Sequence, residues 1–261
     1  MADPTDLLRL AIDIAREAGA LLLDRDPGRR LDVATKSTET DVVTDKDRAA
    51  ERLIVSRLRD ARPDDAVLGE EGGARGDAAA GVRWLVDPID GTVNYLYSLP
   101  QYAVSIAAEV DGRVGAGVVL DPEKNELYAA TRGGGATCNG VPIHCTNVTD
   151  LGQTLVATGF AYAAERRRRQ AQVLVELLPT VRDIRRLGAS SLDLCAVAGG
   201  RVDAYYEVGL NRWDVAAGAL IAAEAGATVE VVDAGGFAVA AGPGVFDAFQ
   251  ALLTRLGAAE V

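Results

Sequence analysis

Two aspartates in the segment WLVDPIDGTVNY, residues 84–95, have a spacing that could do chemistry. Asp87 and Asp90 stand three residues apart, with a proline between them and a glycine after them. Two carboxylates on such a turn repel each other by about 4 kcal/mol at a separation of ~4 Å and an effective dielectric constant of ~20. Oxygen ligands of this kind suit a hard dication such as Mg²⁺. The alternative is a turn with solvated aspartates, because Asp, Pro and Gly are ordinary turn residues.

Three further segments place carboxylates at the ends of predicted elements: TETDVVTDKD, LGEEGG and NRWDVAAG. Glu70 follows the apolar run AVL, which indicates a buried strand. Asp214 opens a helix-forming segment, where an acid in the first turn or at the cap is common. Taken singly, the paired glutamates indicate a charged surface and Asp214 indicates a helix cap. The combination with the DPID turn favours a carboxylate-rich site that a cation could neutralise.

The composition excludes several classes of protein. The chain has 261 residues and a formal net charge of −11, which argues against nonspecific binding to nucleic acid or anionic lipid. Cys138, Cys145 and Cys195 form neither a disulfide framework nor a metal-ligand pattern, which fits a reducing compartment. Charges interrupt the apolar positions of the N-terminal segment, so we expect no signal peptide and no membrane span. We therefore expect a cytoplasmic protein.

The first half of the chain, residues 1–150, predicts two helices followed by a largely antiparallel sheet. Apolar residues recur at helical spacing over residues 5–24, with Thr5 as the expected cap, and a Thr-x-x-acid pattern precedes a second helix. Short β-branched runs separated by Asp-Gly and Asn-Gly dipeptides follow, and they include RWLVD and VPIHC. We expect the first of these strands to end at Asp87, because Pro88 cannot donate to a sheet.

The second half, residues 151–261, alternates predicted strands and helices. Such alternation is typical of a layered α/β arrangement in which helices cover the faces of a sheet. The chain shows no internal repeat and no long linker. We therefore interpret residues 1–261 as one domain with two halves.

These segments, in this order, resemble the inositol monophosphatase family of Mg²⁺-dependent, lithium-sensitive phosphatases. The resemblance rests on DVVTDKD, GEE, WLVDPIDGTVNY, GRVDAYYE and WDVAAGALIAAEAGA, and it runs from the first helix to about residue 232. Bacterial members that act on inositol 1-phosphate look most similar, through DAYYE and VRDIRRLG. The resemblance implies an α/β fold, the αβαβα five-layered sandwich of the inositol monophosphatase and fructose-1,6-bisphosphatase type.

The resemblance implies that the opening motif is the centre of a metal site. In similar enzymes the counterparts of Glu70, Asp87 and the main-chain oxygen of Ile89 hold a first Mg²⁺ ion. The counterparts of Asp90 and Asp214 join Asp87 at a second ion. A third, weaker ion near Glu70 is common in the family, so we expect two to three Mg²⁺ ions.

The resemblance also implies a reaction without a covalent phosphoenzyme. Two dications roughly 3.5–4 Å apart can polarise a phosphate and generate a hydroxide-like nucleophile. Water on the first metal would attack phosphorus, assisted by Glu70 and by the hydroxyl of Thr92, which Asp47 would orient. The amides of Gly91 and Thr92 would donate to phosphate oxygens at the start of a helix.

For the alcohol part of the substrate, the resemblance points to one glutamate and one loop. Glu207 in YYE matches a glutamate that accepts hydrogen bonds from inositol hydroxyls, whereas without the family it would indicate an exposed acid at a strand end. Gly188, Ala189 and Ser190 match the loop beside the inositol ring. Relatives often carry a hydroxyl residue at the position of Ala189, and Ser190 could supply that hydroxyl instead.

Three other features of the sequence are interpreted as follows. Lys36 and Asp41 match a flap that closes over the metals in similar enzymes. His144, the one histidine of the chain, is expected to be structural and to lie in a strand. The basic run ERRRRQ at 165–170 predicts a solvated helix face, and the alternative is a surface for an anionic partner.

We therefore expect a Mg²⁺-dependent phosphomonoesterase that hydrolyses myo-inositol 1-phosphate by means of metal-activated water, and family members are generally homodimers. One alternative is a phosphatase with a broader or different sugar-phosphate substrate, such as fructose 1,6-bisphosphate or histidinol phosphate. Another is a regulatory partner of the transcription machinery.

Overall fold

The structure is a computed structural model that describes residues 2–24, 33–35, 38, 41–77, 81–232 and 236–261. Lys36 of the expected flap lies outside the described residues. The helices are α1 (Pro4–Leu23), α2 (Asp45–Ala61), α3 (Thr92–Leu96), α4 (Ala164–Leu177), α5 (Ser190–Ala198), α6 (Arg212–Glu224) and α7 (Phe246–Arg255), with short 3-10 helices at Leu151–Gln153 and Ala258–Glu260. None of the helices in these ranges is both long enough and apolar enough to cross a membrane.

The strands form one large, one small and one two-stranded sheet. The large sheet contains β3 (Ala66–Gly69), β4 (Gly73–Arg75), β5 (Val82–Asp90), β6 (Ala103–Val110), β7 (Arg113–Asp121), β8 (Glu126–Thr131), β9 (Ala136–Cys138) and β10 (Val141–Pro142), in the order β10-β9-β8-β7-β6-β5-β3-β4. The small sheet contains β11 (Leu155–Thr158), β12 (Asp183–Arg185), β13 (Ala204–Val208), β14 (Thr228–Val232) and β15 (Phe237–Ala241), in the order β12-β11-β13-β15-β14. The pair β1 (Val33–Thr35) and β2 (Val42–Thr44) stands apart from both.

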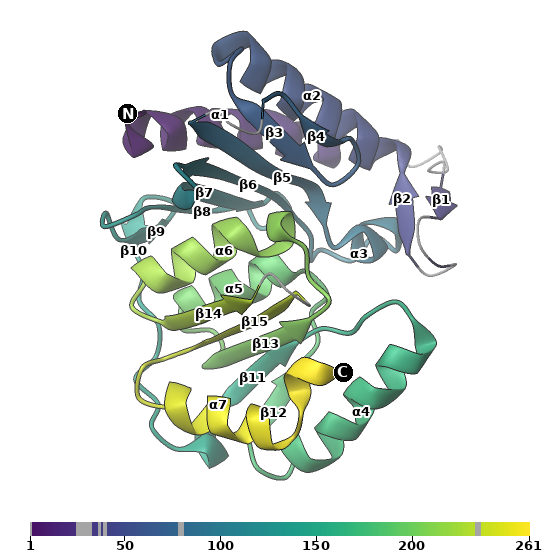
Figure 1. The fold of residues 1–261 in the computed structure, drawn as a ribbon, viewed down its shortest axis with the longest axis vertical. Helices are drawn as coiled ribbons and strands as arrows, with labels where there is room; N and C mark the ends of the chain where they lie inside the picture. Colours follow the sequence, from purple (N-terminus) through teal and green to yellow (C-terminus); the bar gives the residue numbers. More distant parts are fainter. Residues whose placement is uncertain (1, 25–32, 36–37, 39–40, 78–80, 233–235) are drawn as a thin grey trace.

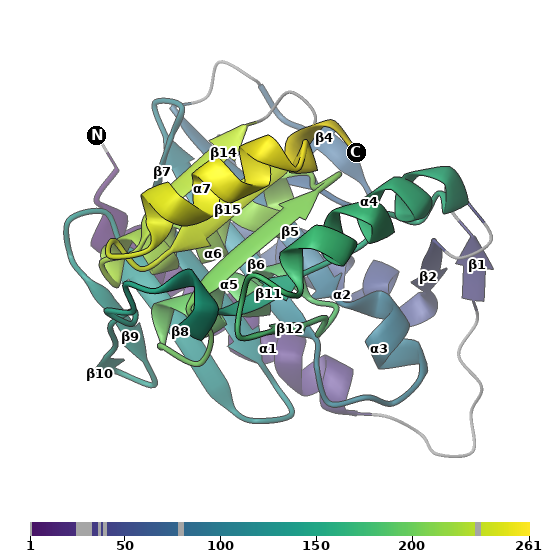
Figure 2. The ribbon, with the colours of Figure 1, turned by 90° about the horizontal axis from the view of Figure 1, so that it is seen from below.

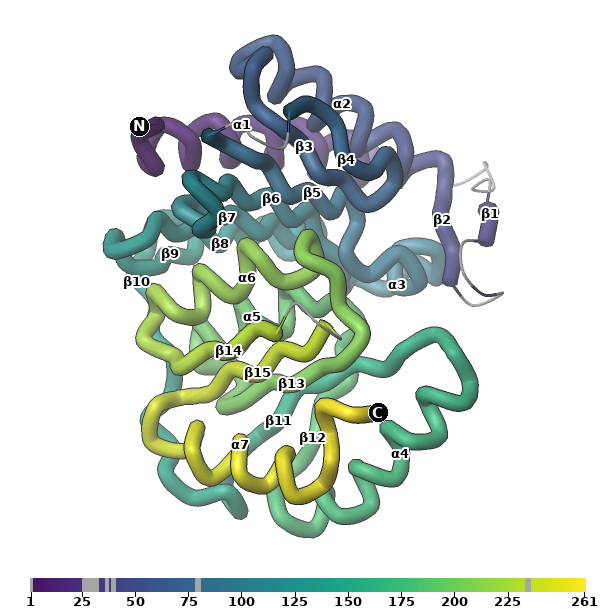
Figure 3. The backbone as a smooth tube through the Cα atoms, viewed as in Figure 1, coloured from purple at the N-terminus to yellow at the C-terminus, as the bar shows by residue number. Residues whose placement is uncertain are grey.

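The helices and the two larger sheets stack as five layers. Figure 1 shows α1 and α2, the large sheet, α5 and α6, the small sheet, and then α7 and α4 from top to bottom. The view from below in Figure 2 shows α4 and α7 over the outer face of the small sheet. The tube in Figure 3 shows that the layer of α5 and α6, in green, separates the two sheets. The expected αβαβα sandwich is therefore confirmed.

Apolar side chains form three clusters between these layers, and one of them surrounds the central layer of α5 and α6. Trp84 on β5 belongs to the cluster beneath α1 and α2, whereas its neighbour Leu85 belongs to the cluster around α5 and α6. Tyr205 and Tyr206 on β13 divide in the same way between that central cluster and the one around α7. Successive side chains of a strand point to opposite faces. A strand that is covered on both faces therefore has a continuous run of apolar residues in its sequence.

The expected turns and the second helix cap are confirmed. Asp111 and Gly112 join β6 to β7, and Asn139 and Gly140 join β9 to β10, all four with positive φ. Such φ values are what the primed hairpin turns need. The capping box of α2 is also present, formed by Thr44 and its N3 acid.

Three local predictions are wrong. Asp3, not Thr5, caps α1, because the amide of Thr5 donates to Asp3 Oδ1 at 2.8 Å. β5 continues through Pro88 to Asp90, and its pairing with β6 shifts register between Asp87 and Asp90, so the missing N–H interrupts no regular ladder. The strand that begins at Val141 ends at Pro142, so His144 lies outside any strand.

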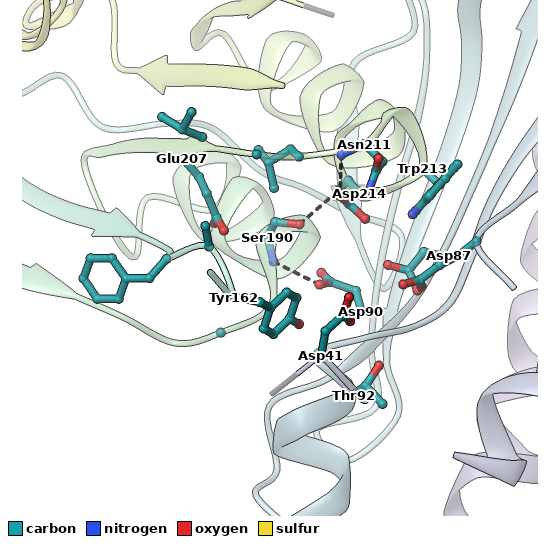
Figure 4. Close-up of a pocket in the computed structure, with 18 of the residues that line it drawn as sticks. Asp41, Asp87, Asp90, Thr92, Tyr162, Ser190, Glu207, Asn211, Trp213 and Asp214 are labelled. Carbon is teal, nitrogen blue, oxygen red and sulfur yellow. Dashed lines mark hydrogen bonds between the residues drawn. The ribbon is translucent and has the colours of Figure 1, made fainter. Parts of the chain in front are cut away.

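The topology brings the ends of several elements to one place. β3 and β5 run parallel, so Glu70 after β3 and the end of β5 lie at the same edge of the large sheet. β11 and β13 run parallel in the small sheet, and Glu207 lies near the end of β13. The first turns of α5 and α6, which carry Ser190 and Asp214, lie between these two edges (Figure 4).

We propose that the two halves unfold as one domain, because the α5–α6 layer packs against both sheets. The sequence has two tryptophans, Trp84 in the first half and Trp213 in the second. The variants W84F and W213F each keep one tryptophan as a fluorescent reporter. For each variant, we expect the urea unfolding curve measured by fluorescence to coincide with the curve measured by circular dichroism. A fluorescence midpoint that separates from the circular dichroism midpoint in either variant would contradict a single cooperative unit.

Candidate active site

A cavity of about 490 Å³ lies where these element ends meet. Its lining includes six acids and two arginines: Asp41, Glu70, Asp87, Asp90, Glu207, Asp214, Arg166 and Arg186. Figure 4 shows Asp87 and Glu207 at opposite sides of the site, with Asp90 between them. The carboxylates that the sequence marked at separate element ends therefore share one cavity.

The backbone of the DPID segment explains how its aspartates are held. The amide of Ile89 donates to Asp87 Oδ1 at 3.0 Å, which fixes that carboxylate against its own turn. Gly91 has φ of 92°, and a Cβ there would lie 3.0 Å from the main-chain oxygen of Gln101. Glycine is required at this position both for its left-handed φ and for this close approach. The turn leads directly into α3, which begins at Thr92.

The acids around Asp87 destabilise one another's charged forms. Asp87 is 2% exposed, and burial raises its pKa well above the usual range, with further contributions from Glu70, Asp90 and Asp214. Burial likewise raises the pKa of Asp214, although the amide of Asn211 donates to its Oδ2 at 2.6 Å. Like charges in a poorly solvated site have this effect, and a cation would reverse it.

Asp90 is held by the first turn of α5. The amides of Ser190 and Ser191 donate to its two carboxylate oxygens at 3.2 and 2.7 Å, and the hydroxyl of Ser191 donates at 2.5 Å. Burial raises the pKa of Asp90, while these bonds and the charge of Arg186 lower it. Sequence reasoning missed Ser191, since only the tertiary fold brings it to Asp90.

The acids fit a hard divalent cation through the chemistry of their donors. Glu70, Asp87, Asp90 and Asp214 all offer carboxylate oxygens, and Ile89 lines the same cavity. These are the ligands that Mg²⁺ prefers. In the described part of the chain, no three Asp, Glu, His or Cys side chains are already spaced as a metal cage. Three of the acids, Asp87, Asp90 and Asp214, instead accept hydrogen bonds from nearby amides.

Thr92 and Asp47 make the contact that the resemblance implies. Thr92 Oγ1 lies 3.0 Å from Asp47 Oδ1 and 3.0 Å from the main-chain oxygen of Ile89, and its single proton can serve one of them at a time. The other oxygen of Asp47 accepts from the amide of Thr44 at 2.8 Å and from its hydroxyl. Burial raises the pKa of Asp47 to about 6 against these bonds. The capping box of α2 therefore also fixes the partner of Thr92.

Glu207 lies at the far side of the cavity from Asp87 (Figure 4). The residue is half-buried, and Tyr205 donates its hydroxyl to Glu207 Oε2 at 3.0 Å. The pKa of this carboxyl is raised to about 7, chiefly by burial; the Tyr205 hydrogen bond and Arg186 lower it, and Asp90 raises it. An exposed acid at a strand end would not behave in this way.

The loop before α5 contributes unequally to the cavity. Gly188 and Ser190 line it, whereas Ala189 is 1% exposed, packs in the central apolar cluster and is absent from the lining. The hydroxyl of Ser190 donates to the main-chain oxygen of Asp214 at 3.2 Å. Ser190 therefore joins the starts of α5 and α6 through its hydroxyl and faces Asp90 through its amide.

Several lining residues were not predicted from the sequence. Arg166 lines the cavity and donates from Nε to the main-chain oxygen of Val261 at 2.8 Å, so the solvated-face interpretation of the basic run is wrong for it. It holds for Arg168, which pairs with Glu165 on the exposed side of α4. Tyr162 also lines the cavity, and burial raises its pKa to about 12. Only the position of α4 in the fold distinguishes these arginines.

The shift at Glu207 predicts a pH-dependent stability of the metal-free protein. Its pKa rises from 4.5 to about 7 on folding, so folded chains keep a proton that unfolded chains release between these values. The free energy of unfolding should therefore fall as pH rises through this window. The variant E207Q has no titrating group at this position. Its free energy of unfolding minus that of the original chain should therefore increase by up to about 3 kcal/mol from pH 4.5 to pH 8.

Urea unfolding in EDTA at several pH values measures this difference. The control E176Q changes an exposed glutamate on α4 and should keep a constant difference from the original chain. A difference for E207Q that stays constant with pH would show that Glu207 ionises as easily in the folded chain as in the unfolded one.

Comparisons with known proteins agree with this arrangement. A family model described as the inositol monophosphatase family matches residues 3–260. The chain is 46% identical to the inositol-1-monophosphatase of Mycobacterium leprae (strain TN), over 97% of this chain and 95% of that protein. It is 39% identical to the Nus factor SuhB of Escherichia coli (strain K12), over 85% of this chain and 84% of that protein. The solved structure of Mycobacterium tuberculosis SuhB superposes with a TM-score of 0.83 at 43% identity, over 98% of each chain. The chain therefore belongs to the inositol monophosphatase family, a family of phosphatases.

Proposed function

We propose that this phosphatase is Mg²⁺-dependent and hydrolyses myo-inositol 1-phosphate to inositol and phosphate. The observation that carries the proposal is the meeting of the Asp87 acid cluster, the Thr92–Asp47 pair and Glu207 in one cavity. Relatives named inositol-1-monophosphatase cover nearly the whole chain, which supports the choice of substrate.

Five residues would hold two or three Mg²⁺ ions. Glu70, Asp87 and the main-chain oxygen of Ile89 would form one position, and Asp90 and Asp214 would join Asp87 at another. When bound, Mg²⁺ supplies positive charge for the phosphate and lowers the pKa of a water molecule. The acids themselves gain from this charge, since each is buried beside other acids.

The remaining groups of the chain would orient water and phosphate. Thr92 can donate its hydroxyl hydrogen bond to Asp47, which leaves a lone pair of Thr92 Oγ1 to accept a hydrogen bond from the attacking water. Glu70 would accept the proton that this water loses as it bonds to phosphorus. The amides of Gly91 and Thr92 come before the first bond within α3, in which Tyr95 donates to the oxygen of Gly91 at 3.0 Å. They have no acceptor inside the helix, so they can donate to phosphate oxygens.

The alcohol would lie between Asp90 and Glu207. A carboxylate accepts hydrogen bonds and does not donate them, so an ionised Glu207 favours a leaving group rich in hydroxyls. Gly188 lines the same cavity. Asp41 lines the cavity too, which supports a flap role for it.

The variant D90N tests the metal assignment. It removes a charge and keeps one of the two oxygens, which can still accept from the amide of Ser191. We therefore expect an intact fold and a rate of inositol 1-phosphate hydrolysis lower by at least about 100-fold. Calorimetric titration of Mg²⁺ should show weaker binding. The matched control D64N changes an exposed aspartate in a turn and should retain both properties. Normal hydrolysis by D90N would refute the assignment of Asp90.

A panel of phosphate esters tests the substrate. We expect phosphate release to be fastest from inositol 1-phosphate, to require Mg²⁺ and to be inhibited by Li⁺, compared with fructose 1,6-bisphosphate, histidinol phosphate and a 3′-phosphonucleotide. The two arginines in the cavity make the bisphosphate the strongest competitor, because a second phosphate could pair with them. Rapid cleavage of another ester without turnover of inositol 1-phosphate would replace the proposed substrate.

A second candidate function is regulation of the transcription machinery. The relative from Escherichia coli is named a Nus factor, and α4 presents exposed arginines such as Arg168. A pull-down of purified transcription proteins with D90N would separate this role from hydrolysis, and the net charge of −11 favours a protein partner over nucleic acid. Binding that survives in D90N and is lost when Arg168 and Arg169 are changed to Glu would support it.

We also propose that the protein is a homodimer, since family members generally are. Sedimentation equilibrium of the purified chain should give twice the mass of one chain. A monomer at micromolar concentration would contradict this.

A further inference from the structure

Gly159 and Glu207 lie side by side on neighbouring strands. β11 and β13 pair in parallel, with Thr158 opposite Tyr206, so the next residue of each chain segment continues the same register. Residues in register on adjacent strands direct their side chains to the same face. The side chain of Glu207 therefore lies on the face of the sheet to which a side chain at position 159 would point.

The carboxyl of Glu207 occupies the space that a side chain of Gly159 would need. A Cβ atom on Gly159 would lie 2.0 Å from Glu207 Oε1, 2.1 Å from Cδ and 2.2 Å from Oε2. Gly159 has no left-handed φ, so its conformation alone does not demand glycine. The demand comes from the contact with this one carboxyl.

The other side of the carboxyl is fixed by Tyr205. Its ring is fully buried in the central apolar cluster, and its hydroxyl donates to Glu207 Oε2 at 3.0 Å. Tyr205 and Glu207 are two residues apart on β13 and therefore share a face. Glu207 is thus held between a rigid donor on its own strand and the bare backbone of the neighbouring strand.

We propose that Gly159 is a positioning residue for substrate specificity: by lacking a side chain, it sets where Glu207 presents its carboxylate to the hydroxyls of the leaving alcohol. This inference rests on the proposed function, in which Glu207 recognises a polyol. A methyl group at this position would force the carboxyl to retreat by about 1 Å, from 2.0 Å to the 3.0 Å below which real Cβ contacts essentially never occur. The displaced atoms are the end of a flexible side chain, so the fold should accommodate the change.

The variant G159A tests this in steady-state kinetics with two esters. Inositol 1-phosphate depends on Glu207, whereas phenyl phosphate offers no hydroxyl to it. We expect kcat/KM for inositol 1-phosphate to fall by about 10- to 100-fold, mainly because KM rises. For phenyl phosphate we expect a fold-decrease in kcat/KM that is at least about five times smaller. The control G115A adds a methyl group with only ordinary contacts, the nearest at 3.5 Å, and should change neither value.

A double-mutant cycle with E207A shows whether Gly159 acts through Glu207. If it does, G159A should add little to the loss that E207A already causes. Equal losses for both esters, or additive losses in the cycle, would overturn the proposal. If G159A is too unstable to assay, E207D withdraws the carboxyl by one methylene group, and G159A should then cost less thermal stability in that background than in the original chain. An equal cost in both backgrounds would also overturn it.

The two proposals fail in different ways. If the original chain cleaves phenyl phosphate but no inositol phosphate, the proposed substrate is wrong. The cycle is then run with the polyol phosphate that the panel identifies, and additive losses there would count against Gly159 alone.

Discussion

The fold depends on holding several like charges together in one poorly solvated cavity. Asp87, Asp90 and Asp214 each have a pKa raised by burial, and neighbouring acids raise it further at Asp87 and Asp214. Their mutual repulsion would spread free side chains apart. Main-chain amides offset this: Ile89 donates to Asp87, Ser190 and Ser191 to Asp90, and Asn211 to Asp214. A cation of the kind proposed would meet acids whose positions the backbone already restricts.

The five-layer arrangement is what makes those amides available. The layer of α5 and α6 lies between the sheets, and both helices direct their N-terminal turns to the cavity (Figures 1 and 4). A helix N-terminus offers unpaired N–H groups and a partial positive charge. Asp90 uses the start of α5 and Asp214 caps α6 from within its first turn. The same helices pack in the central apolar cluster between the two sheets, so we expect the acid site and this core to form together.

Sequence patterns predicted the parts of this arrangement that are local. Residues close together in the chain determine the capping box at Thr44, the hairpin dipeptides and the acids at element ends. The family resemblance then indicated that the separate acidic segments form one site. The continuation of β5 through Pro88 depends on a register shift against β6, which no local pattern records. Arg166 and Arg168 are equivalent in the sequence, and only the packing of α4 turns one of them to the cavity. Ser191 and Gly159 escaped notice for the same reason, since their partners are about a hundred and about fifty residues away.

The two ends of the cavity are held by different means, and this has a consequence for specificity. The acids around Asp87 accept from backbone amides that belong to turns and helix starts, so a change in their geometry would disturb the fold. Among the described residues, the hydroxyl of Tyr205 donates to Glu207, and the absence of a side chain at Gly159 leaves room for its carboxyl. Displacing it costs one hydrogen bond and moves the end of a flexible side chain. Under the proposed role of Glu207, substitutions around it would alter which alcohol is accepted while the groups proposed for phosphate chemistry stay in place. In that way one scaffold would serve several phosphate esters.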